Sequence, residues 1–129
     1  MNKSPTHAAG LEVRRAVLGA DYVDAAIGRA DDFTGPLQDY ITEHAWGAVW
    51  TRPGLERKTR SMLNLVMLTA LNRPHELELH IRGALTNGVT RDEMREIFIH
   101  ASVYCGVPAA LDAIRIARKV FAELDSAAD

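Results

Sequence analysis

Residues 74–88 read PHELELHIRGALTNG, and this stretch is the most informative segment for the fold. Its apolar side chains recur three and four residues apart, which is the spacing of an amphipathic helix. They are Leu77, Ile81, Ala84 and Leu85. Pro74 suits the first turn of a helix, and Gly88 supplies the left-handed residue that commonly follows a helix end. The stretch therefore predicts one helix with a defined beginning and end.

Helical periodicity continues on both sides of this segment, without a convincing run of alternating apolar and polar residues. Further helices are predicted within residues 6–18, from Asp21 as N-cap toward residue 30, after Gly35-Pro36 to about 48, over about 56–72, from 91 to 105 and from 108 to 124. Thr90 and Glu93 have the spacing of a capping box. Seven helices with short joints predict an all-α, single-domain bundle over residues 1–129.

The periodicity also predicts which helix faces are buried. Between Gly35 and residue 48 the expected buried stripe is Leu37, Tyr40, Ile41, Ala45 and Ala48. The helix over 56–72 is apolar on nearly every side from Met62 onward, which is typical of a central, surrounded helix. In the last two helices the expected core positions are Met94, Ile97, Phe98, Ala101, Cys105, Leu111, Ile114, Ala117, Phe121 and Leu124.

Composition excludes several classes of protein. The chain has 129 residues, 47% of them apolar, and a net charge of −2, so no basic excess points to nucleic acid. Its single cysteine, Cys105, excludes an internal disulfide framework. Residues 1–10 lack the apolar run of a secretory signal, and residues 62–71 are too short to span a bilayer. We expect a soluble, cytoplasmic protein that contacts neither nucleic acid nor membrane.

The charge is unevenly distributed along this acidic chain. Residues 52–73 carry a net charge of +4. The cations are Arg52, Arg57, Lys58, Arg60 and Arg73, against Glu56. A local cationic segment is compatible with a small anionic ligand, and equally with a solvated helix N-terminus.

His80 lies at the border between the apolar face of the helix over 74–86 and a polar line that includes Glu76 and Asn87. A histidine one helical turn after a carboxylate can be held in one tautomer and tuned near neutrality, as a general acid or base requires. The alternative is a half-buried core histidine with satisfied hydrogen bonds.

The residue after Glu43 is a second histidine that lies on a predicted apolar helix face. His44 falls within the expected apolar stripe, and the indole rings of Trp46 and Trp50 lie one turn apart. Two tryptophans can wall a pocket and offer N–H donors. They can equally belong to a plain core or to an oligomer interface.

No metal or cofactor site is predicted. None of the five histidines is paired at the three- or four-residue spacing that holds zinc on one helix. His75 and His80 are five residues apart and point in different directions. The sequence also lacks a glycine-rich phosphate loop and a nucleophile elbow.

From about Gly10 to Leu124 the chain resembles the carboxymuconolactone decarboxylase family. The blocks that carry the resemblance are residues 12–19 (EVRRAVLG), 44–47 (HAWG), 50–55 (WTRPGL), Arg60-Ser61, Leu79-His80, 87–90 (NGVT) and 104–110 (YCGVPAA). The C-terminal half is shared with a wider superfamily that includes alkylhydroperoxidase D. The resemblance implies the alkylhydroperoxidase D-like helical fold.

The peroxidase members of that superfamily carry a Cys-x-x-Cys pair ahead of the matching histidine. Arg73 and Glu76 occupy those two positions here. A disulfide-forming cycle needs two thiols, and Cys105 is predicted on a different helix. The sequence therefore argues against a thiol peroxidase.

The resemblance implies a carboxy-lyase without metal or organic cofactor. The family's reaction converts 4-carboxymuconolactone to 3-oxoadipate enol-lactone and CO₂, in the protocatechuate branch of the β-ketoadipate pathway. Relatives form trimers, hexamers or larger rings, so we expect a homo-oligomer. The alternative is a helical homo-oligomer, non-enzymatic or of different specificity, that binds a small carboxylate.

Helix phase and resemblance together suggest roles for individual residues. His80 is the expected general acid, positioned by Glu76 or Glu43. The remaining residues would bind the anionic lactone: Arg60 and Arg73 its carboxylates, with Arg52 as a further candidate, and His44 and Trp46 the oxygen of the dienolate.

Overall fold

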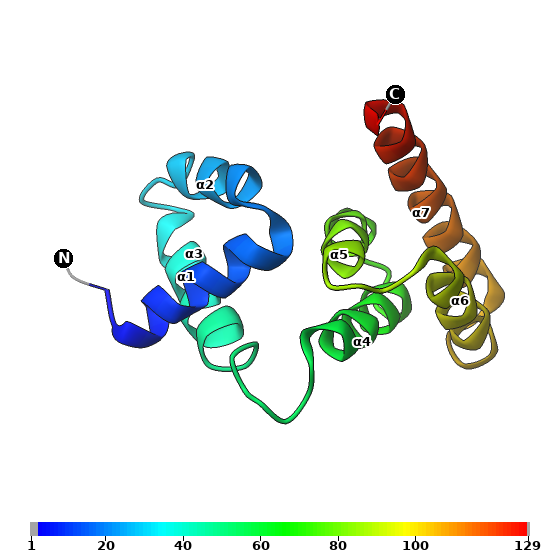
Figure 1. The fold of residues 1–129 in the computed structure, drawn as a ribbon, viewed down its shortest axis with the longest axis horizontal. Helices are drawn as coiled ribbons and strands as arrows, with labels where there is room; N and C mark the ends of the chain where they lie inside the picture. The colour runs from blue at the N-terminus through cyan, green and yellow to red at the C-terminus, as the bar shows by residue number, and fades with distance from the viewer. Residues whose placement is uncertain (1–2, 129) are drawn as a thin grey trace. The chain divides into compact units, whose positions relative to one another are not determined.

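The structure is a computed structural model that describes residues 3–128, and these residues contain helices and no strand. The polypeptide forms two compact units, which meet in sequence at Arg57 and Lys58 (Figure 1). The first contains α1 (Pro5–Leu18), α2 (Ala20–Gly28), α3 (Gly35–Tyr40) and the π-helix η1 (Ile41–Gly47). The second contains α4 (Arg57–Ala70), α5 (Pro74–Thr86), α6 (Arg91–Cys105) and α7 (Val107–Ala128). The predicted all-α class and the seven α-helices are confirmed for the described residues.

Two glycines allow α1 and η1 to pack backbone against backbone. A Cβ atom on Gly10 would lie 2.0 Å from the carbonyl oxygen of Thr42, and one on Gly47 would lie 2.3 Å from the carbonyl oxygen of Thr6. Real Cβ atoms do not approach other atoms so closely, so neither position accepts a side chain without a backbone shift. Beside this contact lies the small core of the first unit, which consists of Val13, Val17, Trp46 and Trp50.

Most of the predicted stripe of residues 37–48 is wrong, although Ile41 is half-buried and packs against the small core. Leu37 and Tyr40 are 60% and 61% exposed, and Ala45 and Ala48 are exposed as well. The buried residues of η1 are Thr42, Trp46 and Gly47. Hydrogen bonds in a π-helix run from residue i to i+5, so each turn takes more residues than the α-helical period assumes. The face that packs on α1 is therefore not the one predicted.

The start of α2 also differs from the prediction. Asp21 lies in the first turn, and the N-cap is Gly19, whose φ of 95° suits a residue without a side chain. Gly19 also ends α1, as predicted. One glycine therefore both ends α1 and caps α2.

In the second unit, the predicted core of α5 is confirmed. Leu77, Ile81 and Ala84 are buried in one apolar cluster with residues of α4, α6 and α7. The helix begins at Pro74, and Gly88 beyond its end has a φ of 92°. The capping box is also confirmed, because Thr90 Oγ1 accepts from the Glu93 amide at 3.0 Å and Glu93 Oε1 accepts from the Thr90 amide at 2.9 Å.

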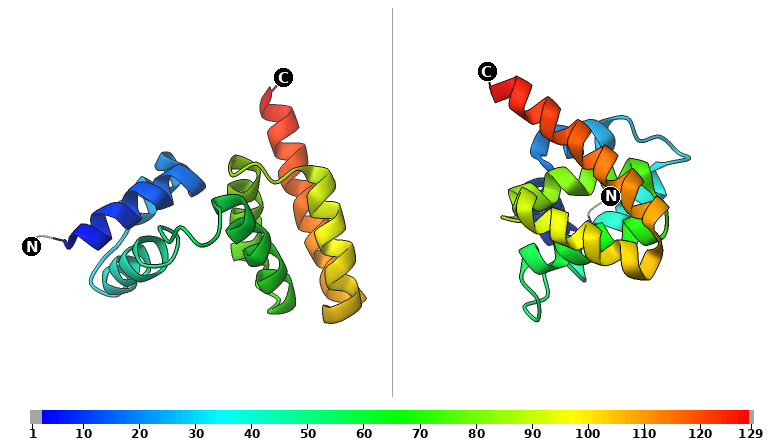
Figure 2. Two further views of the ribbon diagram at one scale, coloured as in Figure 1. Left: turned by 60° about the horizontal axis from the view of Figure 1, so that its bottom comes forward. Right: turned by 90° about the vertical axis from the view of Figure 1, so that its right-hand side faces the viewer.

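Two predicted burial patterns in this unit are wrong in part, although the predicted Ala117 is buried and the predicted Ile114 and Phe121 pack against the core. Helix α4 is not buried on every side, since Leu63 and Met67 are each about half exposed. Helix α7 buries a face of small residues, which is made of Ala110, Ala113, Ala117 and Val120, while Leu111 and Leu124 are 45% and 37% exposed. Small side chains let α7 lie close to α5 and α6, whereas the prediction gave most weight to the largest apolar residues. Figure 2 shows α6 and α7 side by side.

Cys105, predicted in the core, is only half-buried at the end of α6. No helix of the described residues has both the length and the apolar character needed to cross a membrane. The expectation of one domain spanning residues 1–129 stays a prediction.

Candidate active site

The strongest candidate site lies where α4 and α5 face each other in the second unit. Asn64 Nδ2 on α4 is 3.4 Å from His80 Nδ1 on α5. Both side chains are half-buried. The imidazole therefore has a polar partner on the neighbouring helix.

A second amide contact joins the same two helices. Asn87, which caps the C-terminus of α5, donates from Nδ2 to Ser61 Oγ at 2.9 Å. Ser61 is almost fully buried. Ser61 and Asn64 are three residues apart and so share one face of α4. We call these four residues, Ser61, Asn64, His80 and Asn87, the α4–α5 polar seam.

Burial lowers the pKa of His80 below its ordinary value of 6.5, because removing the ring from water disfavours its charged form. The negative charge of Glu76, one turn earlier on α5, acts in the opposite direction, but the pKa stays lowered. The imidazole is therefore mostly neutral near pH 7.

The predicted cations of this unit differ in their surroundings. Arg60 is half-buried on α4, one turn before Asn64 and thus on the same side of that helix. Arg73 is exposed at the N-cap position of α5, and its Nη1 donates to the carbonyl oxygen of Leu71 at 3.2 Å. Arg60 thus lies on one of the two helices that form the polar seam, and Arg73 lies at the start of the other. Of the two side chains, Arg73 is the more exposed to solvent.

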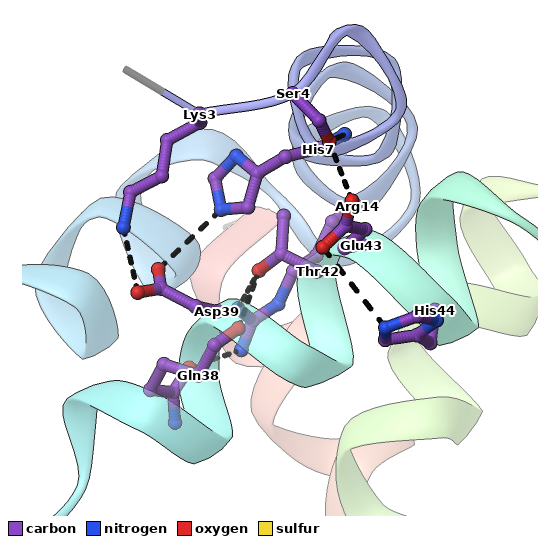
Figure 3. Close-up of polar contacts among 9 residues, drawn as sticks. All are labelled: Lys3, Ser4, His7, Arg14, Gln38, Asp39, Thr42, Glu43 and His44. Atoms are coloured by element: carbon purple, nitrogen blue, oxygen red, sulfur yellow. Dashed lines mark hydrogen bonds and ion pairs between the residues drawn. The ribbon is translucent and has the colours of Figure 1, made fainter. Parts of the chain in front are cut away.

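Glu43 and His44 belong to the first unit, on η1. Glu43 Oε1 accepts from Ser4 Oγ at 2.5 Å, and its Oε2 lies 4.0 Å from His44 Nε2 (Figure 3). His44 is exposed, and its ring lies against that of Tyr40, with 4.4 Å between centroids. Glu43 thus contacts the histidine next to it, and its predicted action on His80 stays a prediction.

Beside Glu43, a buried arginine fixes the start of η1 against α1. Arg14 donates from Nη1 to Thr42 Oγ1 at 3.1 Å and from Nη2 to Gln38 Oε1 at 2.9 Å (Figure 3). Its guanidinium bonds to neutral oxygens of α3 and η1. This arginine therefore has a structural role in the first unit.

Trp46 and Arg52 complete the predicted set. The Trp46 ring is buried and stacks on Trp50, with 4.8 Å between centroids. Arg52 is exposed in the turn that follows η1. Whether either residue contacts a substrate stays a prediction.

The structure thus groups Arg60, Glu76 and His80 on α4 and α5, with Arg73 at the start of α5, and it groups Glu43, His44 and Trp46 on η1. Sequence reasoning missed Ser61 and Asn64. A signal was present, because Asn64 interrupts the apolar run that begins at Met62. A polar residue in such a run needs a hydrogen-bond partner when it is buried.

Among the described residues, no group of three or more His, Cys, Asp and Glu side chains is arranged to hold a metal ion. Chemistry without a metal or organic cofactor stays a prediction.

Comparisons with known proteins agree with the sequence blocks. Residues 35–119 match the Carboxymuconolactone decarboxylase family. The chain is 44% identical to a 4-carboxymuconolactone decarboxylase of Acinetobacter baylyi over 96% of its own length and 92% of that protein. It is 48% identical to a nitrosuccinic acid decarboxylase of Metarhizium robertsii, over 89% of the chain and 80% of that protein. A 4-carboxymuconolactone decarboxylase sequence of Pseudomonas putida is 45% identical over 36% of the chain and 98% of that sequence. The chain therefore belongs to the carboxymuconolactone decarboxylase family.

Proposed function

We propose that this protein is a carboxy-lyase that converts 4-carboxymuconolactone to 3-oxoadipate enol-lactone and CO₂. The observation that carries the proposal is the 44% identity, over nearly the whole of both chains, to a relative named for this substrate. The half-buried His80 of the polar seam supplies a suitable proton donor. The proposal places the enzyme in the cytoplasm, in protocatechuate breakdown, as a homo-oligomer.

The substrate itself can accept the electron pair that decarboxylation releases. Its scissile carboxylate is on a ring carbon joined through a double bond to the lactone carbonyl. Cleavage of the C–C bond sends the pair through the double bond onto the carbonyl oxygen, which gives a dienolate and CO₂. A proton then adds to the carbon next to the carbonyl and gives the enol-lactone. Because the substrate is its own electron acceptor, no cofactor is required to supply one.

The protein then has three tasks. It must bind a dianion, for which we propose Arg60 and Arg73, since a guanidinium grips a carboxylate with two parallel hydrogen bonds. It must deliver one proton to carbon, which we assign to His80. The third task is to stabilise the dienolate oxygen; His44 and Trp46 remain the proposed donors, and Arg52 remains a further candidate for a carboxylate.

The lowered pKa of His80 is compatible with proton delivery. The two negative charges of the substrate favour the charged imidazolium, so binding of the dianion raises the pKa of the ring. Glu76, exposed one turn before His80, acts in the same sense. Substrate binding and uptake of the catalytic proton are therefore coupled.

A second substrate follows from the relative in Metarhizium robertsii. In nitrosuccinic acid one carboxylate is on the carbon that carries the nitro group, so loss of CO₂ sends the electron pair onto that group as a nitronate. Protonation at carbon gives 3-nitropropanoate. Both substrates are dicarboxylates with a built-in electron acceptor, and nitrosuccinic acid is our second candidate.

The test compares both substrates with the same purified protein. We expect kcat/KM for freshly prepared 4-carboxymuconolactone to exceed that for nitrosuccinic acid, with peroxide reduction as a negative control. A preference for nitrosuccinic acid would select the second candidate. Binding of the lactone without turnover would contradict both and favour the carboxylate-binding alternative.

A further inference from the structure

Asn64 is the polar side chain that contacts the proposed proton donor from a different helix. It lies inside α4, next to Leu65, which is fully buried, and its Nδ2 is 3.4 Å from His80 Nδ1. A carboxamide at the boundary of an apolar core lowers the stability of the fold unless its hydrogen bonds are made. The contact with His80 is one of those bonds.

This contact decides which ring nitrogen carries the proton of the neutral imidazole. An amide nitrogen can only donate, so Nδ1 must offer its lone pair and the ring proton must be on Nε2. We propose that Asn64 is a positioning residue that holds neutral His80 in the Nε2–H tautomer, so that Nε2 is the atom that delivers the proton to the substrate carbon. The delivery step rests on the proposed function, whereas the tautomer does not.

An amide suits a histidine that is charged for only part of the cycle. When the ring gains its second proton on Nδ1, rotation of the carboxamide presents Oδ1, which accepts from Nδ1–H. Delivery of the Nε2 proton to carbon leaves the neutral ring protonated on Nδ1, and proton exchange with solvent then returns it to the resting Nε2–H tautomer. A carboxylate at position 64 would instead hold Nδ1–H permanently and raise the pKa of the ring. An aliphatic side chain would remove the donor that Asn64 presents to Nδ1.

Burial of the ring, rather than its charged neighbours, favours a neutral resting His80. Glu76 on α5 favours the imidazolium, but it is exposed, and burial of the ring prevails in lowering the pKa of His80. On α4 the charged residue one turn before Asn64 is Arg60, a cation.

Nuclear magnetic resonance with ¹⁵N-labelled histidine tests the tautomer directly in the full-length protein. The His80→Gln variant identifies the His80 signals by their loss. At a pH above the ring's titration, we expect a protonated Nε2 and an unprotonated Nδ1. A protonated Nδ1 would overturn the inference, and this reading needs no substituted Asn64.

Two variants test the positioning role. In Asn64→Asp we expect Nδ1 to become protonated and the His80 titration to move up by ~1 pH unit or more, the usual effect of an opposite charge at this distance. In Asn64→Leu we expect mixed tautomers and a loss of about 10- to 100-fold in kcat with little change in KM. Unchanged His80 signals in both variants would overturn the inference.

Ser61→Ala is the matched control, because it removes the other hydrogen bond of the polar seam and leaves the Asn64–His80 contact in place. We expect it to lower thermal stability without altering the His80 tautomer. A change of tautomer equal to that of Asn64→Leu would show a general effect of the seam and contradict a specific role of Asn64.

The outcomes also separate this inference from the proposed function. Turnover of the lactone by a protein with Nδ1 protonated would contradict only the inference. The expected tautomer in a protein inert toward both acids would contradict the proposed function and the delivery step with it.

Discussion

His80 combines the features that a proton donor to carbon requires. It is half-buried, its pKa is lowered by burial, and its Nδ1 faces an amide on the adjacent helix. The proposed reaction consumes one proton in each turnover, so the ring must take up a new proton from solvent before the next one. Exposed Glu76, one turn away, keeps that side of the helix polar.

Replacing His80 by Ala is expected to lower kcat for the lactone by about 10²–10⁴, the usual contribution of a general acid. The matched control is His75→Ala, since His75 is exposed on the same helix. Steady-state turnover measures both variants, and circular dichroism confirms that they fold. Near wild-type kcat in His80→Ala would remove this residue from the mechanism.

The lowered pKa also predicts a pH dependence. The free enzyme must take up a proton on His80, whose pKa lies below 6.5. The ratio kcat/KM is therefore expected to be level below that pKa and to fall as the pH rises through it, by about tenfold per unit when one proton is required. A kcat/KM that rises with pH over this range would show that the neutral ring is the active form.

At the scale of the residue, helical phase predicted that Glu76 and His80 lie one turn apart on one helix, and the resemblance added their roles in the reaction. Asn64 could not be assigned to His80 in the same way. The contact depends on how α4 crosses α5, and helical periodicity contains no information on crossing geometry.

Among the elements, the contact of α1 with η1 leaves no room for a Cβ atom on Gly10 or Gly47. Gly47→Ala would place a Cβ atom 2.3 Å from the backbone of Thr6. We expect a loss of about 1–3 kcal/mol in the free energy of unfolding, the usual cost of overpacking, because the obstacle is backbone rather than a flexible side chain.

Gly28→Ala is the control for that substitution, since no atom lies within 4 Å of the added Cβ. Denaturant titration of both variants measures the difference. Equal stability of Gly47→Ala and wild type would contradict the close packing of α1 on η1.

The ends of α5 and the start of α6, which depend on local chemistry, were predicted well. Pro74, Gly88 and the capping box of Thr90 and Glu93 act within one turn of the chain. The buried faces of η1 and α7 were predicted only in part, for two physical reasons. A π-helix changes the number of residues per turn, and the close packing of α7 selects alanines rather than the larger Leu111 and Leu124.

For the whole molecule, family membership and chemistry point to one class of reaction. The relatives from Acinetobacter baylyi and Metarhizium robertsii are named for different acids. Both acids can stabilise the carbanion that forms when CO₂ leaves, one through a conjugated lactone and the other through a nitro group. In the proposed reaction, the protein's contribution is to bind two carboxylates and to supply a proton.

The most direct test measures CO₂ released per 4-carboxymuconolactone consumed, using protein treated with a chelator and shown to contain no metal or organic cofactor. The account predicts one CO₂ per lactone, at the rate of the untreated protein. Loss of turnover on chelation, with recovery when a metal ion is added back, would contradict it.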